Sequence, residues 1–146
     1  MKRGFFLFTF LLLAALPFWA QPVSGDEQLS FVGMTLQELI QRFGAPNTVI
    51  AARGSENWQD DVIFQYEQAD FYIYKDRVWQ VGLASISGIS NKERKPSILL
   101  ALGDAAQDMG DHILFPVSGK DWPLTIRINF GSSGQVSAIY VYRSDF

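Results

Sequence analysis

The chain has 146 residues, with 15 acidic and 12 basic side chains and a formal net charge of −3, a balance that argues against a nucleic-acid partner. It contains no cysteine, so we expect neither disulfide bonds nor an acylated N-terminal cysteine. This length suits one compact domain or two closely packed halves, which must be held together by apolar packing.

The segment 1–25 is typical of a secretory signal peptide. Lys2 and Arg3 precede an apolar run that extends from Gly4 to Ala20, and small residues follow up to Gly25. Cleavage after Gly25 fits the small-residue preference best, and cleavage after Ala20 is the second choice. An uncleaved anchor is the alternative, because a run of this length is near the lower limit for spanning a bilayer. We expect cleavage, no stable membrane anchor afterwards, and a periplasmic or secreted protein.

The first predicted helix covers Leu36–Phe43. Thr35 and Glu38 have the spacing of a capping box, in which each side chain accepts a hydrogen bond from the other residue's backbone N–H. Gly44 can adopt a positive φ after the last turn, and Pro46 prevents the helix from resuming. A helix of two turns is marginal in isolation, so its apolar face should pack on a sheet.

Alternating apolar and polar residues predict a β-meander after this helix. A short turn is expected at Gln68–Asp70 and an exposed loop containing Trp58 at 54–61. The predicted strands lie at about Thr48–Arg53, Val62–Tyr66, Phe71–Tyr74 and Val78–Ser85.

The second half of the chain repeats this order. A Ser- and Gly-rich link at Ile86–Asn91 leads to a helix near Lys95–Leu102, where Pro96 is tolerated in the first turn. The following strands are predicted at Ile113–Val117, Thr125–Phe130 and Gln135–Tyr142.

Two apolar patterns recur at nearly the same offset. The helix pattern at Leu39–Gly44 returns at Ile98–Gly103, and Val78–Leu83 is answered by Val136–Val141. Such a period predicts an α+β fold made of two tandem units, each a short helix packed on an antiparallel meander. The units are expected at 26–88 and 89–146, forming one continuous sheet or two sheets that meet at an angle.

A family resemblance lies in the stretch FVGMTLQEL (31–39) and in Gly44-Ala45-Pro46. It is similar to the Gly-Met-Thr helix start of the SmpA/OmlA (BamE-like) outer-membrane-assembly lipoproteins and of the secreted β-lactamase inhibitory protein family. The tandem arrangement resembles the latter. The resemblance implies a repeated helix-on-sheet fold with the sheet face as a protein-binding surface.

The chain also departs from both families. It lacks the acylated cysteine of the lipoproteins and the disulfides of the inhibitory proteins. The loop before Val62 has no aromatic residue after its acids Asp60 and Asp61, where the inhibitors insert an aspartate followed by an aromatic residue. The second half has no Gly-Met-Thr signature, so the resemblance informs fold more than activity.

Candidate binding residues are the large aromatics that alternation places on the sheet face away from the helix. Tyrosine and tryptophan bury large areas at low conformational cost, which suits them to protein interfaces. The alternative is that they pack against each other as cross-strand pairs or between the two halves. Trp58 and Trp122 each lie in a loop before a predicted strand, and either could pack at the rim of the sheet or contact a partner. The predicted partner-binding residues are Tyr72, Tyr74, Trp79, Arg127, Tyr140, Tyr142 and Trp58.

Catalysis has little support in the sequence. His112 is the sole histidine, and we expect a surface or strand-edge residue beside Asp111. The acids near it have no recognised metal-ligand spacing, so we predict no catalytic residues, no metal and no cofactor. The sequence therefore predicts an exported, non-catalytic module that binds a protein partner. The alternatives are a carrier of a small apolar ligand, using a cleft lined by Trp79 and Tyr74, and a degenerate hydrolase that would need a buried, partnered His112.

Overall fold

The computed structural model describes residues 25–53, 61–119 and 121–145. Its α-helices are α1 (Gly25–Leu29), α2 (Leu36–Phe43) and α3 (Lys95–Leu102), and a 3-10 helix follows at Gly103–Ala105. None of the helices in this part of the chain is both long and apolar enough to cross a membrane. The strands are β1 (Thr48–Ala52), β2 (Asp61–Gln65), β3 (Ala69–Tyr74), β4 (Arg77–Leu83), β5 (Ser85–Ile86), β6 (Ile89–Ser90), β7 (Gln107–Asp108), β8 (His112–Ser118), β9 (Pro123–Phe130) and β10 (Val136–Arg143).

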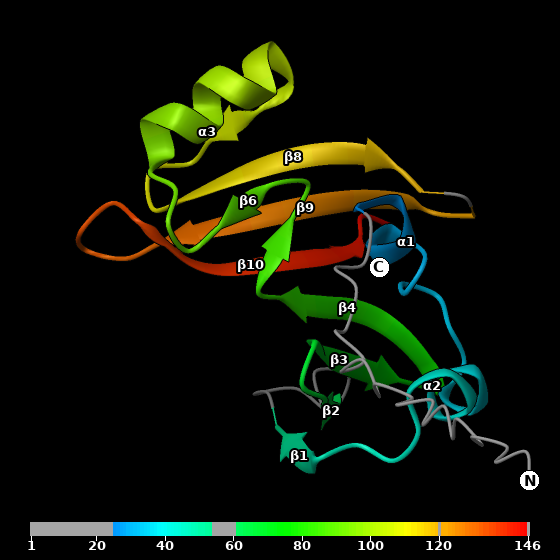
Figure 1. The fold of residues 1–146 in the computed structure, drawn as a ribbon. Coiled ribbons are helices and arrows are strands. Elements are labelled where there is room, and N and C mark those ends of the chain that lie inside the picture. Colours follow the sequence, from blue (N-terminus) through cyan, green and yellow to red (C-terminus); the bar gives the residue numbers. More distant parts are fainter. Residues whose placement is uncertain (1–24, 54–60, 120, 146) are drawn as a thin grey trace, which may run out of the picture.

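Eight of these strands form one antiparallel sheet in the order β1-β2-β3-β4-β10-β9-β8-β7. Two meanders meet where β4 pairs with β10, and we call this pairing the seam. The seam sets Leu83 opposite Ile139, Gly82 opposite Tyr140 and Val81 opposite Val141. Figure 1 shows the strands turning progressively from β8 to β1, as expected for the right-handed twist of strands.

The predicted fold class, α+β with two tandem helix-on-meander units, is wrong. The described residues form one eight-stranded sheet with three short α-helices, so the structure is mainly β. The reason lies at the seam, because the last strand of each meander would otherwise have an unpaired edge, and pairing β4 with β10 satisfies both. Two helices of 8 residues are also too short to cover eight strands as a separate layer.

Helix α2 begins and ends where the sequence predicts. Thr35 Oγ1 accepts from the Glu38 N–H at 3.2 Å, and Glu38 Oε2 accepts from the Thr35 N–H at 2.7 Å. Gly44 follows the helix with a φ of 76°. Just before the helix, the Gly33 N–H donates to the carbonyl oxygen of Val78 at 2.8 Å, which ties this segment to β4.

The core lies on the face of the sheet that carries Phe71, Val81, Ile128 and Val141, all of them buried. Alternation along β3 turns Ala69, Phe71 and Ile73 inward. The part of the core under the first meander is aromatic. There the ring of Phe71 contacts the rings of Phe31, Phe43 and Tyr66, at centroid distances of 5.7, 5.3 and 5.5 Å. Leu39 of α2 and Ile98 of α3 are buried in the same core.

The segment between the meanders contains a hairpin that is not among the predicted strands. The Ser- and Gly-rich link contains the hairpin β5-β6, and Ile86 is buried in the core. Helix α3 follows with the predicted bounds, and an isolated bridge joins Arg94, just before it, to Gln135, just before β10. Figure 1 shows α2 near the β1 end of the sheet and α3 beyond β8.

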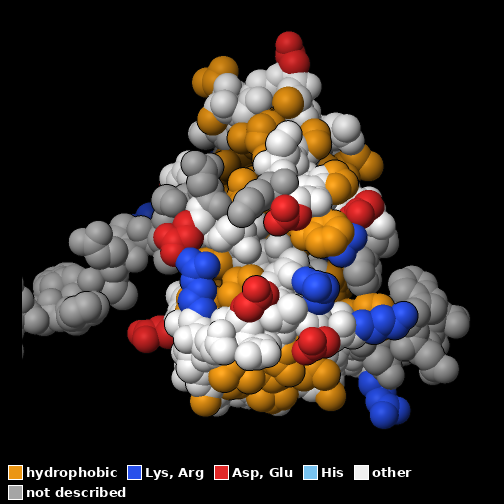
Figure 2. Space-filling model, turned by 90° about the vertical axis from the view of Figure 1, so that its right-hand side faces the viewer, with side chains coloured by type: hydrophobic (Ala, Val, Ile, Leu, Met, Phe, Trp, Pro, Cys, Tyr) orange, Lys and Arg blue, Asp and Glu red, His pale blue; other side chains and the backbone are white. Residues whose placement is uncertain are grey.

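Exposed large hydrophobic residues gather at the corner formed by α2, β1 and β2. Figure 2 shows hydrophobic side chains concentrated at the lower end of the molecule, where Figure 1 places β1. Strand β1 is an edge strand, and none of its five residues is charged. The exposed side chains of this corner are Ile40, Val49, Ile50 and Val62.

Candidate functional site

The sheet face opposite the core, here called the outer face, carries the aromatic residues that the sequence singles out. Because Phe71 and Ile73 point inward, Tyr72 and Tyr74 on β3 point outward. The same alternation places Tyr140 and Tyr142 of β10 on this face. All four tyrosines are half-buried, so each keeps part of its surface in solvent.

Three of the predicted residues, Tyr72, Trp79 and Tyr140, form what we call the aromatic cluster. The Tyr72 ring lies 6.2 Å from that of Tyr140 and 6.4 Å from that of Trp79, both edge to face. The cluster crosses the seam, because Tyr72 belongs to the first meander and Tyr140 to the second. Edge-to-face pairs of this kind are worth about 0.5 to 1.5 kcal/mol each beyond the area they bury.

A β-bulge explains the position of Trp79. The register shifts so that Gln80 lies opposite Tyr72 while Val78 lies opposite Ile73, which leaves Trp79 as the extra residue. Its indole Nε1 donates to Asp61 Oδ1 at 2.8 Å. Alternation alone would not predict this geometry, since Val78 and Val81 both point inward.

Two carboxylates, those of Asp70 and Asp61, lie near Tyr72 in the cluster. Burial, with smaller contributions from the neighbouring Tyr140, Asp70 and Asp61, raises the pKa of Tyr72 to about 12. A raised tyrosine pKa means that additional negative charge is disfavoured here. Of these causes only the two carboxylates, Asp70 and Asp61, would attract a positively charged group, because burial disfavours a charge of either sign.

The other predicted residues surround the cluster. Tyr142 lies opposite Gln80 and Thr125 on the outer face. Arg127 lies opposite Tyr140, but its Nε donates to Asn129 Oδ1 at 2.8 Å, so its side chain is held by its own strand. Tyr74 lies at the end of β3, with the Lys75 ammonium 5.1 Å from its ring centroid. Trp58 lies outside the described residues.

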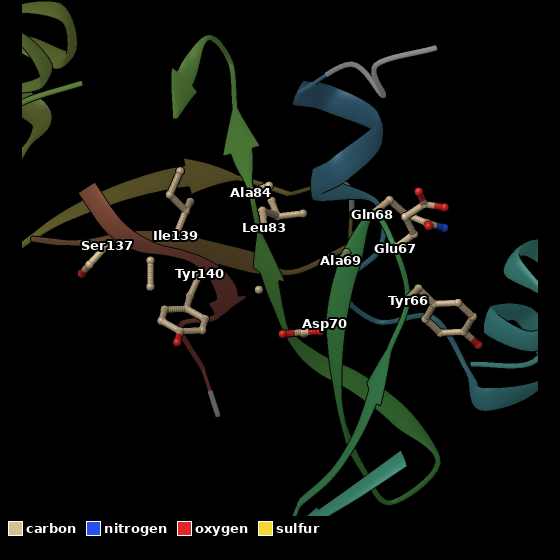
Figure 3. A pocket seen from close by; sticks show the side chains of 12 residues that line it. Tyr66, Glu67, Gln68, Ala69, Asp70, Leu83, Ala84, Ser137, Ile139 and Tyr140 are labelled. Atoms are coloured by element: carbon tan, nitrogen blue, oxygen red, sulfur yellow. The ribbon is translucent and has the colours of Figure 1, made fainter. Parts of the chain in front are cut away.

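At one end of the cluster is a hollow that we call the Gly82 notch, lined in part by Asp70, Gly82 and Tyr140 and about 270 Å³ in volume. Asp70 and Tyr140 lie opposite Gly82 on its two neighbouring strands. Figure 3 shows Asp70 and Tyr140 on the two sides of β4. A methyl group placed on Gly82 would lie 3.5 Å from Asp70 Cβ and 3.5 Å from Tyr140 Cε1, so glycine leaves a gap one side chain wide.

Sequence reasoning missed Asp70 and Gly82. The predicted turn at Gln68–Asp70 is wrong, because Ala69 and Asp70 already belong to β3 and Asp70 pairs with Gln65 and Gly82. The signal was present in the alternation of Asp70, Tyr72 and Tyr74 on one face. A glycine inside a strand pattern is likewise typical of a site that another group approaches closely.

The opposite end of the cluster has a basic rim. A hollow of about 280 Å³ there is lined by Tyr74 and Trp79 and by the basic residues Lys75, Arg77 and Arg143. The small-ligand alternative expected an apolar cleft at these two aromatics. The structure adds three basic residues to the rim of this hollow, one of which, Arg143, is paired with Asp145.

Trp122 packs within the molecule. The Arg143 guanidinium lies 3.7 Å from its ring centroid, and a methyl group on Gly33 would lie 2.4 Å from its indole Nε1. These contacts favour the packing role over direct partner contact. They also explain why glycine stands at the start of the Gly-Met-Thr segment.

His112 and Asp111 form a pair outside the aromatic cluster, at the start of β8. His112 Nδ1 is 2.6 Å from Asp111 Oδ1, and this contact lowers the pKa of Asp111. His112 lies opposite Asn129, and its side chain is 16% exposed. Within the described ranges, no group of three or more His, Cys, Asp or Glu side chains is arranged to hold a metal ion.

Comparison with known proteins gives fold likenesses. No known family matches the sequence, and no curated protein matches it. A DUF4309 family protein from Bacillus subtilis is similar in structure, with 13% identity, a TM-score of 0.45 and coverage of 75% of this chain and 78% of that one. An extracellular protein containing an SCP domain, from Bacillus anthracis, is similar with 11% identity and a TM-score of 0.53 over 87% of this chain. The match covers 49% of that protein, so the chain shares its fold with about half of it.

Proposed function

We propose that this protein is an exported, non-catalytic module that binds a protein partner through the outer face of its sheet. The observation that carries the proposal is the aromatic cluster, in which three large rings lie half-buried on the face opposite the core. Large aromatics that stay partly exposed on a rigid sheet offer binding area at low entropic cost. The N-terminal apolar segment and the extracellular nature of the Bacillus anthracis protein support export.

The charge pattern around the cluster also supports a macromolecular partner. The Gly82 notch, with its acidic residues, lies at one end of the cluster and the basic rim lies at the other. A partner could therefore place basic groups at the first end and acidic groups at the second. On the outer face, the two hollows of about 270 and 280 Å³ lie just below the usual size of small-molecule sites, about 300 to 1,000 Å³. Each hollow suits a single side chain of a larger partner.

Site-specific photo-crosslinking tests this proposal. A photoreactive phenylalanine analogue replaces Tyr142 on the outer face or, as a matched control, Leu100, which is 87% exposed on α3. Irradiation in envelope extract of the source cells should give one dominant protein adduct at position 142 and none at position 100. Excess wild-type protein should compete for that adduct, whereas a Tyr72→Ala, Tyr140→Ala variant with native circular dichroism should not. Equal adducts at both positions, or competition by the double variant, would contradict the proposal.

A further inference from the structure

We propose that the Gly82 notch receives a lysine or arginine side chain of whatever protein binds the outer face. This inference rests on the proposed function and adds the chemistry of the contact. The notch has a carboxylate on one side and an aromatic ring on the other, with bare backbone between them. A lysine or arginine side chain fits the carboxylate, the ring and the bare backbone together. Its aliphatic stem can lie over Gly82 while its charged group contacts the Asp70 carboxylate and the Tyr140 ring.

The Asp70 carboxylate is available for such a contact. Among the residues that the structure describes, no hydrogen bond or ion pair engages it, and the residue is half-buried rather than fully solvated. A half-buried carboxylate gains more from a cation than a fully exposed one, because solvent screens the interaction less. Glu67, which also lines the hollow, adds a second negative charge at its exposed side.

The aromatic side of the notch is held in place. Tyr140 lies edge to face with Tyr72, so its ring is already oriented before a partner arrives. Rigid aromatic groups bind a cation with little loss of conformational entropy. The carboxylates of Asp70 and Asp61, which contribute less than burial to the raised pKa of Tyr72, place negative charge near the Tyr72 ring.

Gly82 offers a test that separates binding from folding. Its φ is not positive, and a methyl group there makes only ordinary contacts. A side chain at this position should therefore fill the notch without straining the strand. Replacing a strand glycine at a compatible position should leave stability unchanged or increase it. Gly82→Val should thus lose the cation site while keeping the fold.

The experiment uses blocked tripeptides of sequence Gly-Lys-Gly, Gly-Arg-Gly, Gly-Glu-Gly and Gly-norleucine-Gly as probes, titrated into isotope-labelled full-length protein and followed by backbone amide NMR. The lysine and arginine peptides should shift the amide signals of Asp70 and Gly82 saturably and less strongly at high salt. The glutamate and norleucine peptides should not. Asp70→Asn and Gly82→Val should weaken the binding at least tenfold, whereas Asp76→Asn, in the turn at the other end of β3, should leave it unchanged.

The two proposals fail in distinguishable ways. A crosslinked partner whose binding is insensitive to Asp70→Asn and Gly82→Val would overturn the cation site and leave the protein-binding function standing. Saturable binding of lysine peptides without any crosslinked protein would support the notch chemistry and overturn the proposed function. Equal shifts with lysine and norleucine peptides would show an apolar contact and overturn the cation site.

Discussion

Gly33 is a position where only glycine fits the fold. Its φ is 96°, a conformation that other residues adopt at a cost, and the Trp122 indole occupies the space where a side chain would start. Gly33→Ala should lower the free energy of unfolding by at least about 2 kcal/mol, from backbone strain and overpacking together. Urea denaturation measures the loss.

Gly110→Ala is the matched control for this variant. Gly110 has nearly the same φ, 95°, but nothing lies within 4 Å of a methyl group placed on it. Gly110→Ala should therefore lower the free energy of unfolding only through backbone strain, by about 1 to 2 kcal/mol. Equal losses for the two variants would mean that the contact with Trp122 contributes nothing.

Tyr72 should titrate late. Burial and the neighbouring Tyr140, Asp70 and Asp61 raise its pKa to about 12, so in the folded protein it stays neutral where an unfolded tyrosine, near pH 10, begins to ionise. This difference contributes stability that is fully present below about pH 10 and is lost as the pH rises toward 12. Ultraviolet absorbance of tyrosinate should show a step near pH 12 in the folded protein. Tyr72→Phe should remove that step, whereas Tyr142→Phe, which keeps Tyr72, should retain it.

At this scale the sequence predicts which way most side chains point. The period of two places Phe71 and Ile73 inward and Tyr72 and Tyr74 outward, as observed. It misplaces Asp70, because glutamine, alanine and aspartate together look like a turn and only the pairing with Gly82 shows that β3 has already begun. The contact between Tyr72 and Tyr140 fits the alternative in which the aromatics pack against each other between the two halves. The particular pair could not be named in advance, since it depends on the pairing of distant strands.

Helix α2 depends on its N-terminal cap. Thr35→Ala removes the hydroxyl that accepts from the Glu38 N–H and should lower the free energy of unfolding by about 1 kcal/mol. Thr35→Ser keeps that hydroxyl and should lose much less. Thermal unfolding followed by circular dichroism compares the two variants, and similar losses in both would show that the methyl group rather than the cap matters.

Strand β1 is the element most exposed to unwanted pairing. Within the described residues no strand covers its second edge, it carries no charge, and Ile50 is 40% exposed on it. Such edges favour association between molecules. Ile50→Lys should reduce self-association at high protein concentration, measured by sedimentation velocity, and change stability by no more than about 0.5 kcal/mol. Leu100→Lys on α3 is the control, and an equal effect there would point to general surface hydrophobicity instead.

Individual elements were therefore predictable and their assembly was not. Both eight-residue helices have the predicted bounds. A capping box and Gly44 mark the first, Leu36–Phe43, whereas only Pro96 in the first turn and Gly103 at the end mark the second, Lys95–Leu102. The short strands β5, β6 and β7 have two residues each, too few for a periodic pattern to appear. The pairing of β4 with β10 leaves no local signal, and for this reason the sequence left open whether the two halves form one continuous sheet or two sheets at an angle.

For the whole molecule, acid should be destabilising. Five carboxyl groups have a lowered pKa because they accept hydrogen bonds, the largest contribution for Glu38 coming from the Thr35 backbone N–H. A lowered folded-state pKa contributes stability above the unfolded value, about 4.3 for Glu and 3.9 for Asp, and this stability is lost as the pH falls below it. The five are Glu38, Glu93, Asp108, Asp111 and Asp145.

The urea midpoint should therefore stay nearly constant from neutral pH down to about pH 5 and fall between about pH 4.5 and 3. High salt should reduce the size of this fall, because the groups lie near the surface. A midpoint that rises on acidification would show that repulsion among the carboxylates dominates their hydrogen bonds. The resemblance to the BamE-like and inhibitory-protein families stays a prediction at this scale.

The seam is also a condition for the cation site. Strand β4 pairs with β10, which follows α3, β8 and β9 along the chain, so the middle of the sheet depends on a contact between distant parts of the sequence. Gly82 and Tyr140 face each other across this pairing, and the cation site exists only once it has formed. A partner that recognises the notch would therefore bind the folded protein and leave chains with an unformed seam unbound.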